Sequence, residues 1–224
     1  MITFNIITLF PELFDPFLKV LPLKRALEKG IIKLNVIQLR DFAVDKRGTV
    51  DSKPYGGGVG MILRVEPVYY ALESIYTSIE NAKQNEKNSI IALAPSGKLF
   101  TQKKAKQLTK KENITLICGR YEGMDERIKK HLATEVISTG EYVLSGGELP
   151  ALTIMEAVTR LLPGVLNKEE ATRVESFSEE KKKEFAQYTR PKIFLNMEVP
   201  EVLLGGDHSK VESWRQESEK SGQK

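Results

Sequence analysis

The sequence lacks the features that define several classes of protein. It contains one cysteine, Cys118, among 224 residues, which excludes an internal disulfide and fits a reducing cytosol. Its two histidines, His131 and His208, are far apart, so no zinc-ligand spacing is present. No apolar run approaches the roughly 20 residues that a membrane-spanning helix needs. We therefore expect a cytoplasmic protein with no membrane segment and no protein-bound metal site.

The charge balance is close to neutral and leaves no basic tail. The chain has 34 Lys and Arg residues against 30 Asp and Glu residues, a net charge of +4. Residues 167–224 contain 11 of the basic residues and 12 of the acidic ones, so the positive excess lies in residues 1–166. A mild excess permits nucleic-acid binding without proving it. A surface for a polyanion must therefore be assembled from local patches.

Short apolar runs alternate with amphipathic stretches along most of the chain. The runs rich in Ile, Leu and Val predict strands over Ile2–Leu9, Ile31–Leu39, Ser89–Ala94, Ile114–Cys118 and Glu135–Ser138. Helical spacing predicts helices over Pro11–Lys29, Glu66–Ala82, Thr101–Lys111, Asp125–Leu132 and Glu148–Leu162. The first strand lacks the basic residues that begin a signal peptide. The pattern favours an α/β fold, a mainly parallel sheet with helices on both faces.

The end of the chain has a different pattern. Asn167–Glu175 is charged and has no apolar periodicity, which is typical of a linker. The following residues show short helical patterns broken by Pro191 and Pro200, and they end in a predicted helix over Ser209–Ser221. We therefore expect a main domain over residues 1–166, a linker over residues 167–175 and a small helical domain over residues 176–224.

The segment Lys53–Met61 places four glycines within five positions. Such clusters allow positive φ and close backbone approach, and they often bind phosphate. No Gly-Lys-Ser/Thr follows, so the segment is not a P-loop, and it lacks the strand and helix of a dinucleotide fingerprint. A flexible turn is the alternative interpretation, and the segment alone does not decide between the two.

Three further segments each follow a predicted strand: Ala94–Gly97, Gly119–Arg127 and Ser138–Pro150. Ligands of open α/β sheets bind beyond the carboxyl ends of strands. In the second segment Arg120 suits a phosphate and Glu122 suits an amino group. The third segment has small side chains and many free main-chain groups, which suits a flat adenine edge. Each segment alone is compatible with an ordinary turn, but together they predict one binding site.

In order along the chain, these segments resemble the bacterial tRNA (guanine-37-N1)-methyltransferases of the SPOUT superfamily. The resemblance covers nearly the whole chain and is strongest at Val50–Gly58, Leu116–Gly123 and Tyr142–Pro150. Ala157–Arg160, Pro163–Leu166, Tyr188–Pro191 and Val199–Leu204 complete it. The resemblance implies methyl transfer from S-adenosylmethionine to N1 of guanine 37 in tRNA, next to the anticodon.

The resemblance also implies a deep trefoil knot between about Leu93 and Pro150, a homodimer, and tRNA bound through its anticodon stem-loop. Donor contacts are expected from Pro95, Gly97, Gly119, Tyr121, Glu122, Ser138, Thr139, Gly140, Tyr142, Leu144, Gly146 and Gly147. Substrate contacts are expected from Asp51, Tyr55, Gly56, Gly57, Gly58, Arg190 and His208. Mg²⁺ is suggested as a further cofactor, although no compact carboxylate cluster marks a site for it.

Two residues are expected to carry the catalysis. N1 of guanine bears a proton, so the reaction needs a base and a group that stabilises charge on O6. The resemblance assigns the assisting role to Arg160 and the base to the position of Glu175, where the family has Asp. The longer side chain makes placement critical, and a linker charge without a catalytic role is the alternative interpretation of Glu175.

Two other functions remain alternatives to an active guanine-37 enzyme. The change from Asp to Glu at position 175 is compatible with a homologue that binds the donor and tRNA but is catalytically impaired. A knotted methyltransferase for another RNA position is the second alternative. The Tyr188–Pro191 element and the C-terminal region argue against it.

Overall fold

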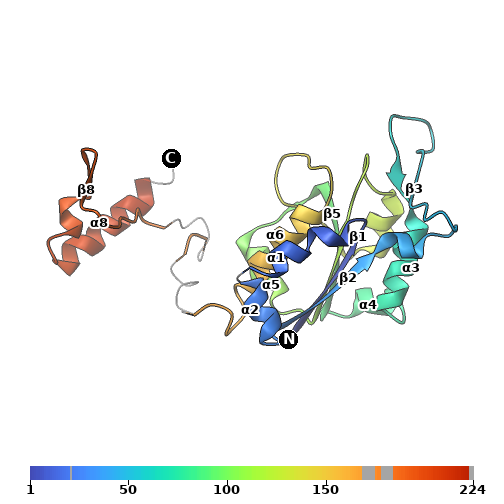
Figure 1. Cartoon of the computed structure of the whole chain (residues 1–224), viewed down its shortest axis with the longest axis horizontal. Helices are drawn as coiled ribbons and strands as arrows, with labels where there is room; N and C mark the ends of the chain where they lie inside the picture. Colours follow the sequence, from blue (N-terminus) through green and yellow to red (C-terminus); the bar gives the residue numbers. More distant parts are fainter. Residues whose placement is uncertain (21, 168–174, 178–183, 222–224) are drawn as a thin grey trace. The chain divides into compact units, whose positions relative to one another are not determined.

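The computed structural model describes residues 1–224 except 21, 168–174, 178–183 and 222–224 (Figure 1). The chain divides into two compact units, Met1–Asn167 and Lys168–Lys224, which are described separately. No helix in the described part of the chain is long and apolar enough to span a membrane.

The first unit is built on a sheet of five parallel strands in the order β2-β1-β6-β5-β7. The strands are β1 (Ile2–Thr8), β2 (Ile32–Gln38), β5 (Asn88–Leu99), β6 (Asn113–Cys118) and β7 (Glu135–Ser138). The predicted parallel sheet is thus confirmed, and four of its strands lie within one residue of their predicted bounds. The fifth, β5, was predicted to end at Ala94 and instead extends to Leu99.

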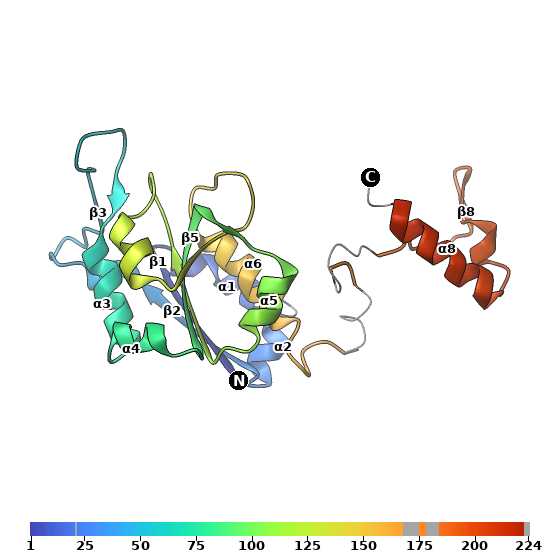
Figure 2. The same cartoon turned by 180° about the vertical axis from the view of Figure 1, so that it is seen from behind.

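Helices cover both faces of this sheet, as predicted (Figures 1 and 2). One face carries α1 (Asp15–Leu18), α2 (Leu23–Glu28), α5 (Gln102–Leu108) and α6 (Glu148–Thr159). The other carries η2 (Leu39–Phe42), α3 (Val65–Ile75), α4 (Ile79–Gln84) and the π-helical turn η3 (Ile128–Leu132). Strand residues on opposite faces supply the two cores: Phe4 and Ile6 of β1 belong to the first, and Ile7 belongs to the second.

Several predicted helices are shorter or interrupted. Pro11–Lys29 was predicted as one helix, but it divides into η1 (Pro11–Leu13), α1 and α2. Pro16 and Pro22 explain the breaks, because proline removes a donor and restricts the residue before it. Glu66–Ala82 divides into α3 and α4 at extended residues, where Ser78 caps α4 by accepting a hydrogen bond from the backbone N–H of Asn81.

A short hairpin that was not predicted carries the glycine-rich segment. Its strands are β3 (Asp51–Ser52) and β4 (Ile62–Leu63), which pair antiparallel. Two-residue strands carry no recognisable alternation in a sequence, which explains why the hairpin was missed. The hairpin places residues 53–61 in the connecting loop.

The second unit contains β8 (Ile193–Phe194), β9 (Met197–Glu198), η4 (Glu201–Leu203) and α8 (His208–Ser221). The terminal helix is confirmed, while the hairpin β8–β9 replaces part of the predicted helical pattern. Leu195 and Asn196 both adopt positive φ at its turn. The Tyr188 and Trp214 rings lie 6.1 Å apart, and the guanidinium of Arg215 lies 4.7 Å from the Phe185 ring centroid.

Candidate functional site

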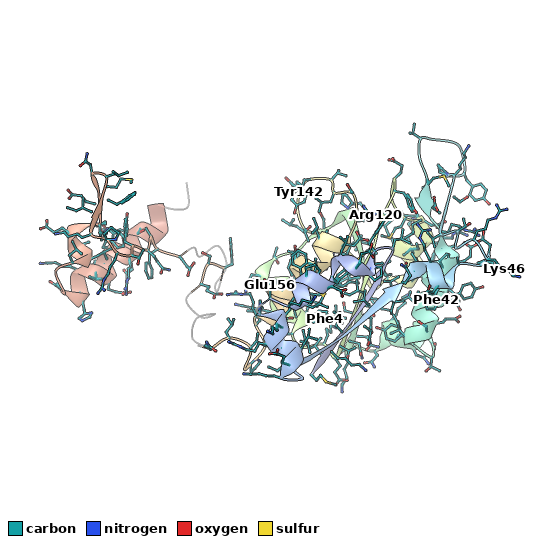
Figure 3. The ribbon with its side chains drawn as sticks, in the orientation of Figure 1. Phe4, Phe42, Lys46, Arg120, Tyr142 and Glu156 are labelled. Atoms are coloured by element: carbon teal, nitrogen blue, oxygen red, sulfur yellow. The ribbon has the colours of Figure 1, made fainter. Side chains whose placement is uncertain are left out.

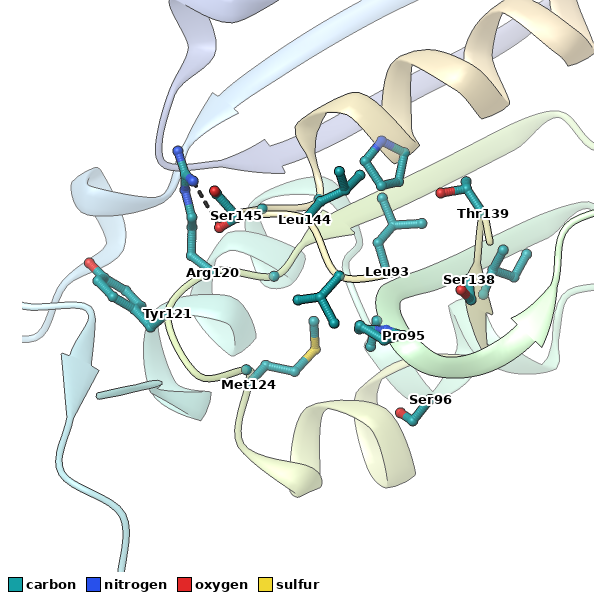
Figure 4. A pocket seen from close by; sticks show the side chains of 18 of the residues that line it. Leu93, Pro95, Ser96, Arg120, Tyr121, Met124, Ser138, Thr139, Leu144 and Ser145 are labelled. Carbon is teal, nitrogen blue, oxygen red and sulfur yellow. Dashed lines mark hydrogen bonds between the residues drawn. The ribbon is translucent and has the colours of Figure 1, made fainter. Parts of the chain in front are cut away.

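The three segments predicted to converge line one pocket, formed by an interruption within β5 and by the loops after β6 and β7 (Figure 4). The pocket has a volume of about 360 Å³, within the range of small-molecule sites. Arg120 and Tyr142 lie at the same edge of the first unit (Figure 3). The convergence follows from the topology, because parallel neighbouring strands end at the same edge of a sheet.

The first wall of the pocket comes from an interruption within β5. Leu93 and Lys98 both pair with Ile137 of β7, so residues 94–97 loop out of the ladder between them. Pro95 and Ser96 thereby line the pocket. The alternative interpretation of Ala94–Gly97, an ordinary turn between a strand and a helix, does not hold, because the strand resumes before α5 begins.

The second wall is the loop after β6. Tyr121 has a φ of 60° and Gly123 a φ of 129°, which turns the chain sharply. The backbone N–H of Glu122 donates to Met61 O at 3.0 Å, and the N–H of Leu63 donates to Gly123 O at 3.0 Å. The loop is therefore held by the β3–β4 hairpin, which connects the glycine-rich segment to the pocket.

The third wall is the loop after β7, which is joined to the second wall. Gly147 N–H donates to Gly119 O at 2.9 Å, and Arg120 Nη1 donates to Ser145 O at 2.8 Å (Figure 4). The Arg120 guanidinium also lies 4.3 Å from the Phe10 ring centroid. Arg120 thus holds the two loops together, a role that its sequence context did not reveal.

Ten of the twelve residues expected to contact the donor line this pocket. They are Pro95, Gly119, Tyr121, Glu122, Ser138, Thr139, Tyr142, Leu144, Gly146 and Gly147. The lining does not include Gly97, which packs against β7, or Gly140, which packs against the Tyr142 ring. Three further lining residues lie outside the three predicted segments: Leu93, Lys129 and Ile137. In the sequence, apolar residues within a strand look like ordinary core positions, and a charged residue at helical spacing looks like an ordinary surface position.

The pocket's chemistry fits a ligand with a flat apolar ring and a charged end. Leu93, Ile137 and Leu144 supply apolar surface, and glycines leave main-chain groups accessible. A β-carbon at Gly147 would lie 2.7 Å from Cys118 Cα, and one at Gly119 would lie 3.0 Å from Leu93 O. Side chains cannot replace hydrogen at these positions, so the walls remain main chain. These properties suit an adenosine-bearing molecule.

The glycine-rich loop has two distinct parts. Tyr55, Gly56, Gly57 and Gly58 are exposed at its tip, and each of these glycines has positive φ. Gly60, with a φ of 81°, instead packs directly beneath the Glu122 side chain. Asp51 is half-buried in β3 at the start of the hairpin. The loop therefore supports the pocket through Gly60, which the flexible-turn interpretation does not account for.

Replacing Gly60 with alanine is expected to lower donor affinity by about tenfold, because the added methyl group collides with the Glu122 stem. Isothermal titration with S-adenosylhomocysteine, without tRNA, measures the change. Gly57→Ala is the matched control, since Gly57 has a φ of 82° but has nothing within 4 Å of an added β-carbon. Equal loss of affinity in both variants would contradict a supporting role for Gly60.

The residues expected to act on the base and the tRNA lie in both units. Arg160 is the C-cap of α6 in the first unit. Glu175 lies half-buried in the second unit, and Arg190 and His208 are also in that unit and are exposed. Next to Glu175, Ser176 Oγ accepts a hydrogen bond from the N–H of Glu184 at 2.9 Å. Among the described residues, no group of three or more His, Cys, Asp or Glu side chains could hold a metal ion.

Cys118 lies buried at the end of β6, next to the pocket loops. Burial raises the pKa of its thiol well above the usual range, and the negative charge of Glu148 raises it further. Arg120 and a hydrogen bond with Thr8 act in the opposite direction. The Glu148 carboxylate, itself buried, accepts a hydrogen bond from Thr8 Oγ1 at 2.8 Å. Cys118 is therefore expected to be a neutral core residue.

The raised thiol pKa predicts a specific pH dependence of stability. Below the unfolded thiol pKa of about 8.5 the thiol is protonated in both states, and above it only the unfolded state loses the proton. Stability should therefore fall as pH rises. Relative to Cys118→Ala, wild type should lose at most about 1.4 kcal/mol per pH unit above that value. Urea unfolding at pH 7 to 9.5 measures this, and parallel curves would contradict it.

Comparisons with known proteins show the family to which the chain belongs. Residues 2–224 match the family described as tRNA (Guanine-1)-methyltransferase TrmD. A protein of Staphylococcus epidermidis named tRNA (guanine-N(1)-)-methyltransferase is 49% identical over 211 residues, which cover 94% of this chain and 83% of that protein. One of the same name from Clostridioides difficile is 47% identical over 215 residues, covering 96% and 90%. The resemblance read from the sequence is confirmed: the chain belongs to the tRNA (Guanine-1)-methyltransferase family.

Proposed function

We propose that this protein transfers a methyl group from S-adenosylmethionine to N1 of guanine 37 in tRNA. The observation that carries the proposal is the pocket, where three loops at one sheet edge present main-chain groups, apolar surface and the charged Glu122 and Lys129. When bound, the donor supplies a methyl group already activated by its sulfonium. The protein must then bind the donor, position the guanine and remove the N1 proton.

We assign the removal of the guanine N1 proton to the carboxylate of Glu175. Guanine N1 is a poor nucleophile until its proton leaves, and a carboxylate that reaches the Watson–Crick edge of an extruded base can accept that proton. Arg160 stabilises the negative charge that develops on O6, because its guanidinium is always protonated and offers several donors. Glu175 takes the place of the family's Asp, so the chain around it must accommodate one additional methylene group.

The tRNA is proposed to contact both units through its anticodon stem-loop. The exposed tip of the β3–β4 hairpin offers an aromatic ring at Tyr55 and main-chain N–H groups at its glycines. Lys46, Arg47 and Lys53 are exposed in the same part of the chain. Such groups suit a phosphate backbone and an unstacked base. Arg190 and His208 would add contacts from the second unit, as the proposed tRNA-binding domain.

Three further properties belong to the same proposal: a homodimer, a deep trefoil knot between about Leu93 and Pro150, and a cytoplasmic location. Two apolar residues of this region are exposed, Val143 in the pocket lining and Leu149 at the start of α6, which supports burial against a second copy. The knot would enclose all three pocket loops, since they lie between those two residues. Mg²⁺ dependence remains a prediction of the family resemblance.

Methylation of defined transcripts tests the proposal. Purified protein and S-adenosylmethionine are incubated with a tRNA transcript bearing guanine 37 and with the same transcript bearing adenine 37. Mass spectrometry then identifies the modified nucleoside and its position. We expect 1-methylguanosine at position 37 of the first transcript alone. A methyl group at another position would favour a different RNA target, and donor binding without product would favour a catalytically impaired homologue.

A further inference from the structure

The charged side chains that line the pocket differ in the contacts they make with other residues. The pocket's ionisable Lys, Arg, Asp and Glu residues, within the described chain, are Arg120, Glu122 and Lys129. Arg120 donates to Ser145 O through Nη1 and stacks on Phe10, which joins the loops, while its Nε is buried without a hydrogen-bond partner among the described residues. Glu122 and Lys129 are the other two charged side chains of the lining. One is negative and the other positive.

Lys129 is presented to the pocket by the π-helical turn η3. Its Nζ lies 2.5 Å from Glu126 Oε2, and its side chain is 20% exposed. The neighbouring Lys130 lies 3.8 Å from the other oxygen of Glu126, is 67% exposed and does not line the pocket. π-helical turns are rare and occur frequently at functional sites. In Figure 4 the helical turn that follows Met124 lies beside Ser96 of the opposite wall.

The rest of the lining cannot satisfy a carboxylate with an opposite charge. It consists of apolar side chains, hydroxyl groups and main chain from β5, β7 and the loop before α6. S-adenosylmethionine ends in an amino acid, whose ammonium and carboxylate both carry charge. Glu122 matches the ammonium, and the carboxylate needs a cationic partner in a partly buried site. Lys129 can provide it from the helical turn, whereas the Arg120 guanidinium is held against Phe10 and Ser145 O.

Resting on the function proposed above, we infer that Lys129 is a donor-binding residue that pairs with the carboxylate of the methyl donor. Together with Glu122 it makes the site selective for a ligand carrying an intact α-amino acid. Glu126 holds the lysine by an ion pair, which limits the side-chain freedom lost on binding. No residue of the predicted donor set fulfils this role, because the set contains no cation.

Two ligands that differ only in the carboxylate test the inference: S-adenosylmethionine and decarboxylated S-adenosylmethionine. Isothermal titration should show that the wild-type protein binds the first about tenfold more tightly, the effect of one charge-assisted contact. In Lys129→Gln the preference should fall to about twofold or less. Lys129→Arg should retain it, since the positive charge remains.

Two control variants distinguish a direct contact between Lys129 and the ligand from effects of losing the Lys129–Glu126 ion pair or a nearby charge. Lys130→Gln removes a neighbouring charge outside the pocket and should retain the preference. Glu126→Gln breaks the Lys129 ion pair but leaves the lysine, so the preference should also persist. Thermal unfolding establishes that each variant is folded.

The possible failures are distinguishable. If the wild-type protein binds S-adenosylmethionine and Lys129→Gln keeps the full preference, the role of Lys129 is wrong while the proposed function stands. If Lys130→Gln removes the preference as completely, the effect belongs to the general charge of η3. If Glu126→Gln removes it, the effect follows from loss of the ion pair. Either result overturns the inference. If the wild-type protein binds neither ligand, the proposed function itself fails.

Discussion

Replacing Glu175 with glutamine is expected to lower kcat for guanine methylation by about 10²- to 10⁴-fold, the usual contribution of a general base. Glutamine keeps the size and the acceptor oxygen of the side chain but cannot take up the N1 proton. Donor affinity should be unchanged, because the pocket lining lies in the first unit and does not include Glu175. Single-turnover kinetics with a guanine-37 transcript measure the chemical step directly.

A conservative variant distinguishes the base from a mere linker charge. Glu175→Asp restores the residue that the family resemblance assigns to this position, with a stem one methylene shorter. If the chain around Glu175 is adapted to glutamate, the aspartate variant should lose activity, because a displacement of about 1 Å can cost on the order of 10²-fold. A large gain of activity would instead favour the impaired homologue. Unchanged kcat in Glu175→Gln would exclude Glu175 as the base.

Arg160 provides an independent check on the same assignment. As the C-cap of α6 it is placed by the fold of the first unit, whereas Glu175 belongs to the second. If the two act on one guanine, their effects should not be additive: the double variant Arg160→Lys/Glu175→Gln should be little worse than Glu175→Gln alone. Lysine keeps the charge at position 160 but loses the planar fork of donors.

The sheet could be predicted because its strands are buried on both faces. Ile2–Leu9 and Ile114–Cys118 are nearly continuous apolar runs, which a parallel sheet covered by helices requires. The helices were less predictable: Pro11–Lys29 has helical spacing throughout, yet Pro16 and Pro22 divide it. The β3–β4 hairpin was not predictable from periodicity, because tertiary contacts with the loop after β6 stabilise its two-residue strands.

The sequence could predict which loops form the site, but it could not predict the contacts between residues within it. The three wall segments could be predicted because each follows a predicted strand, and the ends of neighbouring parallel strands lie at the same edge of the sheet. The apolar lining at Leu93 and Ile137 was hidden, because alternation in a strand does not distinguish core from pocket wall. The support of Glu122 by Gly60 depends on two segments far apart in sequence. Lys129 was hidden for a different reason: helical spacing makes it look like a solvated charge.

Gly97 has a packing role that the family resemblance does not imply. The resemblance places it among the donor contacts, but in the structure it packs against β7. A β-carbon at this position would lie 2.5 Å from both N and C of Ile137 and 2.6 Å from the carbonyl carbon of Val136. These are backbone atoms of the neighbouring strand, so no rotamer change relieves the overlap.

Gly97→Ala is therefore expected to destabilise the first unit by about 3 kcal/mol or more, among the larger effects of a single substitution. Donor affinity should fall with it, by on the order of 10²-fold, because separation of β5 from β7 displaces Pro95 and Ser138 on opposite walls. Urea unfolding measures the first effect, and titration with S-adenosylhomocysteine under native conditions measures the second.

Gly30→Ala is the matched control for this prediction. Gly30 has a φ of 63° and nothing within 4 Å of an added β-carbon, so alanine there introduces backbone strain of about 1–2 kcal/mol without a collision. It also belongs to the same unit, so both variants report on one unfolding transition. If Gly97→Ala costs no more than Gly30→Ala and binds the donor normally, the close contact between β5 and β7 does not maintain the pocket. If only affinity falls while stability is preserved, Gly97 contacts the donor directly, as the resemblance implies.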